Sequence, residues 1–162
     1  MTRRCCSLGL LTALLASGCE DPTSAARIES LGPEPGDYPV GPNHRPGQPC
    51  TWCHSEGGNA EPFELAGTIF LRPGSRAPAT SVRVRLFGPD GKQRSALTND
   101  AGNFFFRRGE LGLSHPLWVK LEGQGQLRAM QTPLRRERSC AGCHRDPAGP
   151  SSAGHIYLLE DP

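Results

Sequence analysis

The stretch TSVRVRLFG, residues 80–88, decides the fold class expected of this chain. Within it, three apolar residues, Val82, Val84 and Leu86, alternate with two arginines. An alternation with a period of two residues is typical of a β-strand that buries one face and exposes the other. We therefore expect a half-buried strand here and examine the sequence on either side for its neighbours.

Five further segments have the character of short strands, and turn residues separate them. They are residues 64–71, 94–98, 102–108, 116–122 and 126–131. GPDGK and TNDAGN lie between successive segments, and Gly91 and Gly102 suit turn positions with positive φ. Six strands at this spacing predict a mainly β protein whose residues 64–131 form a small antiparallel β-sandwich.

The middle of the chain also resembles a known family. GTIF, TSVRVRLFGPDGK, ALTNDAGNFFF and HPLWVKLEG, within residues 66–123, are similar to the carboxypeptidase regulatory-like (transthyretin-like) β-sandwich domain. The family's turn pattern T-x-D/N-x-x-G-x-F-x-F is occupied here by Thr98, Asn99, Asp100, Gly102, Asn103, Phe104 and Phe106. This resemblance implies a scaffold or adhesive module without enzymatic activity, and a fold does not by itself supply a function.

The N-terminus predicts export and lipidation. Arg3 and Arg4 precede a short apolar run that ends in ASGC, which resembles the lipobox of bacterial lipoproteins. We expect residues 1–18 to be a signal peptide and Cys19 to carry lipid, although an ordinary cleaved signal remains an alternative. Glu20 after that cysteine favours the outer membrane of a bacterial envelope over retention at the inner one. Residues 19–43 are rich in proline and predict an extended tether.

The charge and the cysteine count of the mature chain, without this signal, narrow the classes of function that the protein could have. Without its two arginines the formal charge falls from +2 to about zero, so nothing favours nucleic acid as a partner. Of seven cysteines, four remain in the mature chain apart from Cys19, and all four lie in two C-x-x-C-H units. These units are CTWCH, residues 50–54, and CAGCH, residues 140–144.

Three chemistries can use such units. Four thiolates could hold zinc, but this leaves the histidine after each pair without a role. A redox dithiol requires a helix N-terminus in a βαβ unit, which neither sequence context provides, and disulfides within each pair would close short, strained loops. Covalent haem explains every residue, because both cysteines bond to haem vinyl groups and the adjacent histidine binds iron.

The chain therefore resembles a dihaem c-type cytochrome lipoprotein. We expect two haem c groups, attached through Cys50, Cys53, Cys140 and Cys143, with His54 and His144 as proximal iron ligands. The irregular segments 44–63 and 132–162 would carry the haems on either side of the sandwich, and the second would add a terminal strand. Since domain ends are often adjacent, we expect the haems to meet at one pole of the sandwich.

Four residues are candidates for the distal iron positions. His44 lies in a proline-held arm six residues before Cys50, His155 follows a flexible loop, and Met130 would raise a haem's potential. His115 is a weaker candidate, because it opens a predicted strand. Trp52 is expected to pack on its porphyrin or on the sandwich, and Arg135, Arg136 and Arg138 either pair with haem propionates or form a solvated turn.

These expectations favour electron transfer between redox proteins of the cell envelope, in the periplasm or at the surface. Two alternatives remain open. One is a haem enzyme or gas sensor with an open iron position, and the other is a non-redox adhesion or scaffold module. No pair of carboxylates near either unit indicates general acid–base catalysis.

Overall fold

The computed structural model describes residues 22–38 and 40–160. The predicted signal peptide and the predicted lipidation site Cys19 lie outside these residues. The strands within them are β1 (Phe63–Phe70), β2 (Arg83–Phe87), β3 (Gln93–Leu97), β4 (Asn103–Arg107), β5 (Trp118–Gly123), β6 (Gln126–Ala129) and β7 (Ile156–Tyr157). The helix α1 (Pro22–Glu29) and two 3-10 turns, η1 (Cys50–Trp52) and η2 (Cys140–Gly142), complete the described elements.

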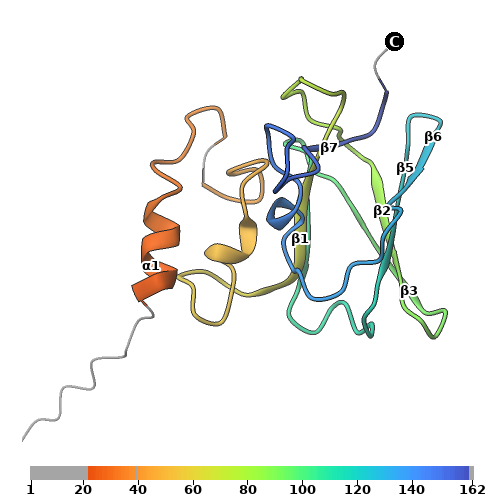
Figure 1. Cartoon of the computed structure of the whole chain (residues 1–162), viewed down its shortest axis with the longest axis horizontal. Helices are drawn as coiled ribbons and strands as arrows, with labels where there is room; N and C mark the ends of the chain where they lie inside the picture. Colours follow the sequence, from red (N-terminus) through yellow and green to blue (C-terminus); the bar gives the residue numbers. More distant parts are fainter. Residues whose placement is uncertain (1–21, 39, 161–162) are drawn as a thin grey trace, which may run out of the picture.

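The strands form two sheets that pack face to face. One sheet has the order β4-β1-β7 and the other the order β3-β2-β5-β6 (Figure 1). All pairings between these strands are antiparallel except that of β1 with β7, which is parallel. The prediction of a mainly β protein with a small β-sandwich is therefore confirmed. Each of the six predicted strand segments contains most of one observed strand.

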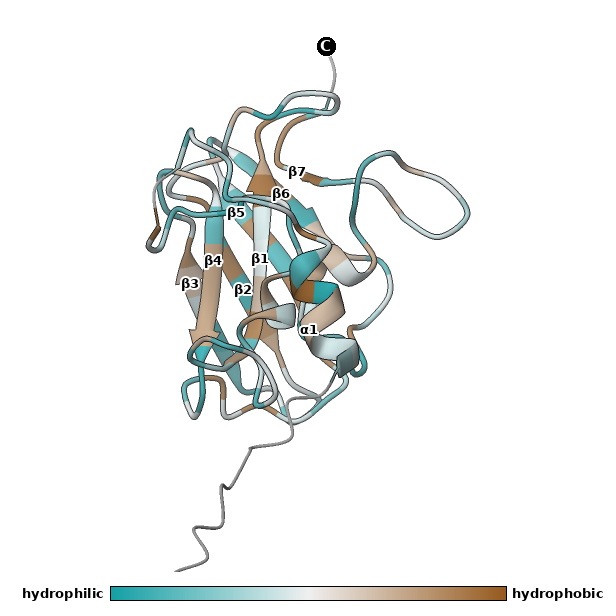
Figure 2. Ribbon diagram, turned by 90° about the vertical axis from the view of Figure 1, so that its left-hand side faces the viewer, coloured by the Kyte–Doolittle hydropathy of each residue, from teal (hydrophilic) through white to brown (hydrophobic). Residues whose placement is uncertain are grey.

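The alternation in residues 80–88 determines how β2 packs. Val84 and Leu86 have no exposed surface, and they join Leu121 of β5 and Leu65 and Ile69 of β1 in the core between the sheets. Burial of each such aliphatic side chain contributes roughly 1.5 to 3 kcal/mol. In Figure 2, β1 and β4 lie in front of the four-stranded sheet, and α1 lies on the viewer's side of both.

The predicted extended tether is partly wrong, because its first residues form α1. Pro22 suits the first turn of a helix, where its missing N–H is not needed, and the alanines that follow favour a helix. The segment is also attached to the domain: the Ser24 hydroxyl donates to the Gly57 carbonyl at 3.2 Å. The guanidinium of Arg45 donates to the carbonyl of Leu31 at 3.4 Å and to that of Gly32 at 2.8 Å.

The helices of the described residues are short. None of them is both long and apolar enough to cross a membrane.

Candidate functional site

Each C-x-x-C-H unit folds as a single 3-10 turn. In the first, the N–H of Cys53 and that of His54 both point to the Cys50 carbonyl, the latter at 2.9 Å. In the second, the N–H groups of Cys143 and His144 donate to the Cys140 carbonyl at 3.1 and 2.8 Å. Residues three and four apart lie on the same side of a helical turn, so this conformation brings both cysteines and the histidine of a unit together.

Both turns pack beside the same strand, β1 (Figure 1). The Ala66 N–H donates to the Arg138 carbonyl at 2.9 Å, which fixes the second unit along this strand. Gly67 faces Cys140 so closely that a Cβ there would lie 2.6 Å from the sulfur. From the sequence we expect the two haems to meet at one pole of the sandwich; in the structure both units lie beside β1.

The first unit borders a cavity of about 270 Å³. The cavity lies on the outer face of the three-stranded sheet, because Phe63 and Phe105 line it while Phe104 and Phe106 belong to the core. Residues of the arm before Cys50 form its other wall. The lining residues that bear on ligand binding are His44, Arg45, Cys50, Cys53, His54, Phe63, Phe105 and Arg107.

His54 is oriented by its backbone contact and by a neighbouring ring. Its Nδ1 lies 2.8 Å from the Glu61 carbonyl oxygen, and its ring stacks on Phe63 with the centroids 3.9 Å apart. Histidines that bind metal typically direct one ring nitrogen to such a carbonyl and present the other to the metal. The ring of His44 lies across from it, with the centroids 5.8 Å apart and the planes inclined by 21°.

The second unit borders a cavity of about 300 Å³. This cavity lies between the sheets, since Leu65 and Ile69 of β1 and Val119 and Leu121 of β5 face it from opposite sides. The other lining residues that bear on ligand binding are Arg128, Met130, Ser139, Cys140, Cys143, His144 and His155. The two candidate sites therefore occupy different sides of β1.

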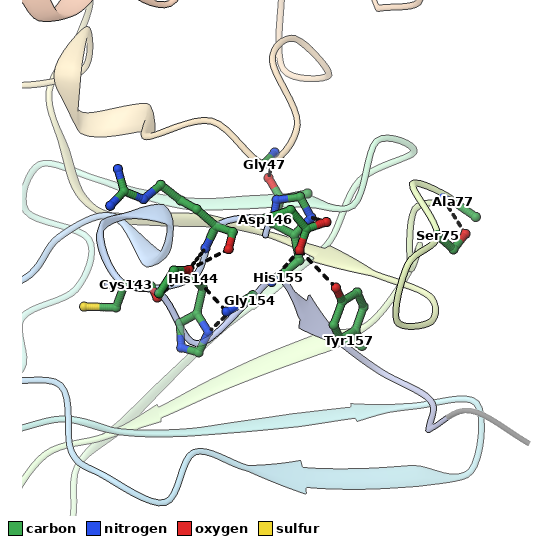
Figure 3. A network of polar contacts seen from close by, with 12 residues as sticks. Gly47, Ser75, Ala77, Cys143, His144, Asp146, Gly154, His155 and Tyr157 are labelled. Atoms are coloured by element: carbon green, nitrogen blue, oxygen red, sulfur yellow. Dashed lines mark hydrogen bonds and ion pairs between the residues drawn. The ribbon is translucent and has the colours of Figure 1, made fainter. Parts of the chain in front are cut away.

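His144 repeats the contact made by His54. Its Nδ1 lies 3.1 Å from the Gly154 carbonyl oxygen, which leaves Nε2 as the nitrogen for a metal (Figure 3). Ser139 also lines this cavity, and its buried hydroxyl has no hydrogen-bond partner among the described residues. A buried hydroxyl without a partner is costly, so this cavity favours an occupant that contacts it.

His155 lines the second cavity but is held by groups outside it. Its Nδ1 lies 3.0 Å from a carboxylate oxygen of Asp146, without the alignment of a hydrogen bond, and Asp146 also accepts from the Tyr157 hydroxyl at 3.3 Å (Figure 3). Its ring stacks on Phe70 at 4.4 Å, and its Nε2 lies against Gly47 of the first arm. Its distal role is less well supported by this geometry than that of His44.

Burial changes the acidity of the thiols and of two histidines. Desolvation raises the pKa of Cys50 to about 11 and that of Cys140 to about 12, and the nearby Cys50 charge contributes to the latter. The pKa of Cys53 is raised for the same main reason. Desolvation lowers the pKa of both His54 and His155, which favours the neutral imidazole that metals bind.

Several residues that the sequence predicts to bear on haem binding do not line either cavity. His115 lines neither of the two cavities. The three arginines before the second unit, Arg135, Arg136 and Arg138, are exposed and also line neither cavity, so the prediction that they pair with a ligand gains no support. Trp52 is half-buried within η1.

Three other arginines, which were not among the residues predicted from the sequence, line the cavities. Arg45 and Arg107 border the first cavity, and Arg128 borders the second. A sequence signal existed for Arg128, because it shares a strand face with Met130 in residues 126–131. No sequence pattern predicts Arg45 and Arg107 as neighbours, because they meet at the first cavity only when the arm before Cys50 folds onto the sheet. Arginine suits the carboxylates of a ligand such as a porphyrin.

The residues present fit covalently attached haem. Both histidines have an oriented Nδ1, both cysteine pairs are free thiols, and each unit has an adjacent, largely apolar cavity. The first volume is below, and the second at the lower limit of, the range of about 300 to 1,000 Å³ for small-molecule sites, so part of each haem would lie outside its cavity. Among residues 22–38 and 40–160, no three or more His, Cys, Asp or Glu side chains are grouped as a metal site.

Comparisons of the chain with protein-family profiles, with curated proteins and with solved structures found no match.

Proposed function

We propose that this chain is a dihaem c-type cytochrome of the bacterial envelope, attached to a membrane through Cys19, that transfers electrons between other redox proteins. The observation that carries the proposal is the repeated geometry of the two units. Each presents two thiols on one 3-10 turn beside a cavity, and each proximal histidine directs Nδ1 to a backbone carbonyl. Neither zinc nor a dithiol accounts for both histidines.

The chain's own residues have three tasks in this proposal. Each thiol would be added across one vinyl C=C bond, with a C–S bond formed and the thiol hydrogen transferred to the other vinyl carbon. His54 and His144 would hold the iron through Nε2, since their Nδ1 atoms are oriented by the carbonyls of Glu61 and Gly154. Haem c would supply a one-electron carrier, and the apolar cavity walls would shield from water the part of it that they contact.

The proximity of the two units supports exchange between them. Both turns contact β1, the first at a cavity on the outer face of its sheet and the second at a cavity between the sheets. Two haems attached at these thiols would therefore lie beside the same strand. This arrangement suits a carrier that accepts an electron at one haem and passes it on from the other.

A mass spectrum tests the proposal directly. The chain, expressed with an export and haem-maturation system, should gain the mass of two haems and retain lipid at Cys19. The double variant Cys50→Ser with Cys53→Ser should lose one haem, and the variant Cys140→Ser with Cys143→Ser should lose the other. Expression without any haem addition would reject the proposal and favour the non-redox scaffold.

A second candidate is a haem enzyme or ligand sensor in which one iron keeps an open position. The second site favours it, because His155 Nε2 packs against Gly47 and its Nδ1 side is held by Asp146. Met130, which also lines that cavity, would instead close the position. Spectra with added carbon monoxide or cyanide separate the two: two low-spin, unresponsive haems support electron transfer, and a ligand-binding haem supports the second candidate.

A further inference from the structure

We propose that a buried polar pair, Thr68 of β1 and Asn103 of β4, positions His44 opposite His54 and thereby makes His44 the distal iron ligand of the first site. This inference rests on the proposed function, since it concerns the iron of the first haem. Thr68 and Asn103 are positioning residues, which act through the arm of residues 42–47 rather than by contact with the iron.

The pair forms a short chain of hydrogen bonds. The Thr68 hydroxyl donates to the side-chain oxygen of Asn103 at 2.7 Å and accepts from the Gly47 N–H at 2.8 Å. The side-chain nitrogen of Asn103 donates to the His44 carbonyl at 3.0 Å and to the Pro42 carbonyl at 3.3 Å. The sheet thus holds the arm at three backbone positions, on both sides of His44.

Burial makes these contacts difficult to replace. Thr68 is 6 % exposed and Asn103 is 7 % exposed, although both lie on the outer face of the sheet, where water would otherwise reach them. The arm covers them, and its backbone provides their partners. A buried amide or hydroxyl that loses its partner destabilises the folded state, so the pair and the arm stabilise each other.

The arm held in this way places the His44 ring opposite the His54 ring at the first cavity, within the separation that two histidine ligands of one metal ion would have. Metal–nitrogen bonds of about 2 Å would separate the centroids of two imidazoles on one metal ion by roughly 6 Å. The observed separation between His44 and His54 is 5.8 Å. Asn99 also holds the arm, because its side-chain nitrogen donates to the Pro42 carbonyl at 2.6 Å, but only the pair contacts the backbone at His44 and at Gly47 among the hydrogen bonds from the sheet to residues 42–47.

The polar contacts of the His44 ring involve Nδ1. The Gly41 N–H donates to Nδ1 at 3.4 Å, and a Glu34 carboxylate oxygen lies 3.9 Å from the same atom. Binding of a metal through Nε2 would place the ring proton on Nδ1, where Glu34 rather than Gly41 would be its partner. Arg45, the next residue, contacts the same Glu34 oxygen at 3.4 Å and fixes that carboxylate.

The test compares four variants of the full, haem-loaded chain. Thr68→Val keeps the shape of the side chain and removes its hydroxyl, Thr68→Ser restores the hydroxyl, and His44→Ala removes the ligand. Thr98→Val is the matched control, because Thr98 is also a buried threonine whose hydroxyl bridges two backbone groups, those of Val82 and Ala79, neither of which belongs to the arm. The readouts are the haem count by mass and the number of ferrous haems per chain that bind carbon monoxide.

We expect two attached haems in every variant. Thr68→Val and His44→Ala should each gain one carbon monoxide-binding haem per chain relative to the unmodified protein. Thr68→Ser and Thr98→Val should gain none, which separates positioning of His44 from a general loss of stability.

Three results would overturn the inference. One is an unchanged count in His44→Ala, which remains informative even if Thr68→Val fails to fold, because His44 lies in the arm outside the sandwich. Another is that Thr68→Val leaves the number of carbon monoxide-binding haems unchanged while His44→Ala raises it. The third is that Thr98→Val raises this number as much as Thr68→Val does. Absence of haem from the unmodified chain would instead reject the proposed function itself.

Discussion

Replacement of Gly67 by alanine should disturb the second site more than the first. A Cβ at this position would lie 2.6 Å from the Cys140 sulfur, 2.7 Å from its Cβ and 3.0 Å from a ring carbon of Phe104. Non-bonded carbon atoms prefer separations of about 3.5 to 4.0 Å, so the added methyl group is roughly 1 Å too close. Either η2 must move away from β1 or Phe104 must shift within the core.

The expected loss of stability in Gly67→Ala depends on how firmly Cys140 and Phe104 are held. The Ala66–Arg138 hydrogen bond fixes the chain just before Cys140, and Phe104 is 2 % exposed within the core cluster. Neither neighbour is the free end of a flexible side chain. Extra volume at such a position costs about 1 to 3 kcal/mol in the free energy of unfolding.

The assay is denaturant unfolding of the haem-loaded chain together with its mass spectrum. We expect Gly67→Ala to lower the unfolding free energy by about 2 kcal/mol and to increase the fraction of chains with a single haem, attached at Cys50 and Cys53. Gly36→Ala is the control, because no atom lies within 4 Å of a Cβ there. A stability within about 0.5 kcal/mol of the unmodified protein, with full occupancy at both sites, would refute the close packing of Cys140 on Gly67.

Three further outcomes are expected. Thr98→Val should lower the unfolding free energy by about 1 to 3 kcal/mol in a denaturant titration, because it removes a hydroxyl that bridges two backbone groups; Thr98→Ser should cost less, and an equal cost would contradict the role of the bridge. In the haem-free chain, burial raises the pKa of Cys50 to about 11 and that of Cys140 to about 12, above the ordinary value of 9.0. The unfolded chain then loses these protons at lower pH than the folded chain, so the unfolding free energy should fall as the pH rises from about 9 towards 11 and 12. The control is the same titration of a variant with serine at both positions. If the two profiles coincide, the thiols are not buried. Arg45→Met should release the two carbonyls that follow α1 and speed proteolytic cleavage of the segment between α1 and the arm, as followed by mass spectrometry, whereas Arg83→Met, on the exposed face of β2, should not.

The strands could be predicted from the sequence because their information is local. Alternation in residues 80–88, with turn residues between neighbouring segments, is sufficient to predict strands and a buried face. The parallel pairing of β7 with β1 could not be read in this way. It depends on two residues whose partners lie almost ninety positions earlier, and such a short strand has no pattern of its own.

The residues of the candidate sites also differ in whether local sequence predicts them. Cys50, Cys53, His54 and their counterparts at 140–144 follow from a motif, and the arm of His44 follows from its proline content. The roles of Thr68 and Asn103 do not, because they depend on a contact between two strands and an arm. The helix at residues 22–29 is hidden in a proline-rich segment, because only the run from Ala25 to Glu29 consists mostly of good helix formers.

The parallel pairing of β7 has a consequence for how the molecule behaves beside copies of itself. β1 is the middle strand of its sheet only because Ile156 and Tyr157 pair with Ile69 and Phe70, while Ser139 pairs with Ala66 further along the same edge. If the last segment were absent, β1 would become an edge strand with unpaired N–H and C=O groups, and exposed edges of this kind recruit strands from other chains. The C-terminal residues therefore cover an edge at which other chains could otherwise add a strand, and the second C-x-x-C-H unit lies between the two segments that cover it.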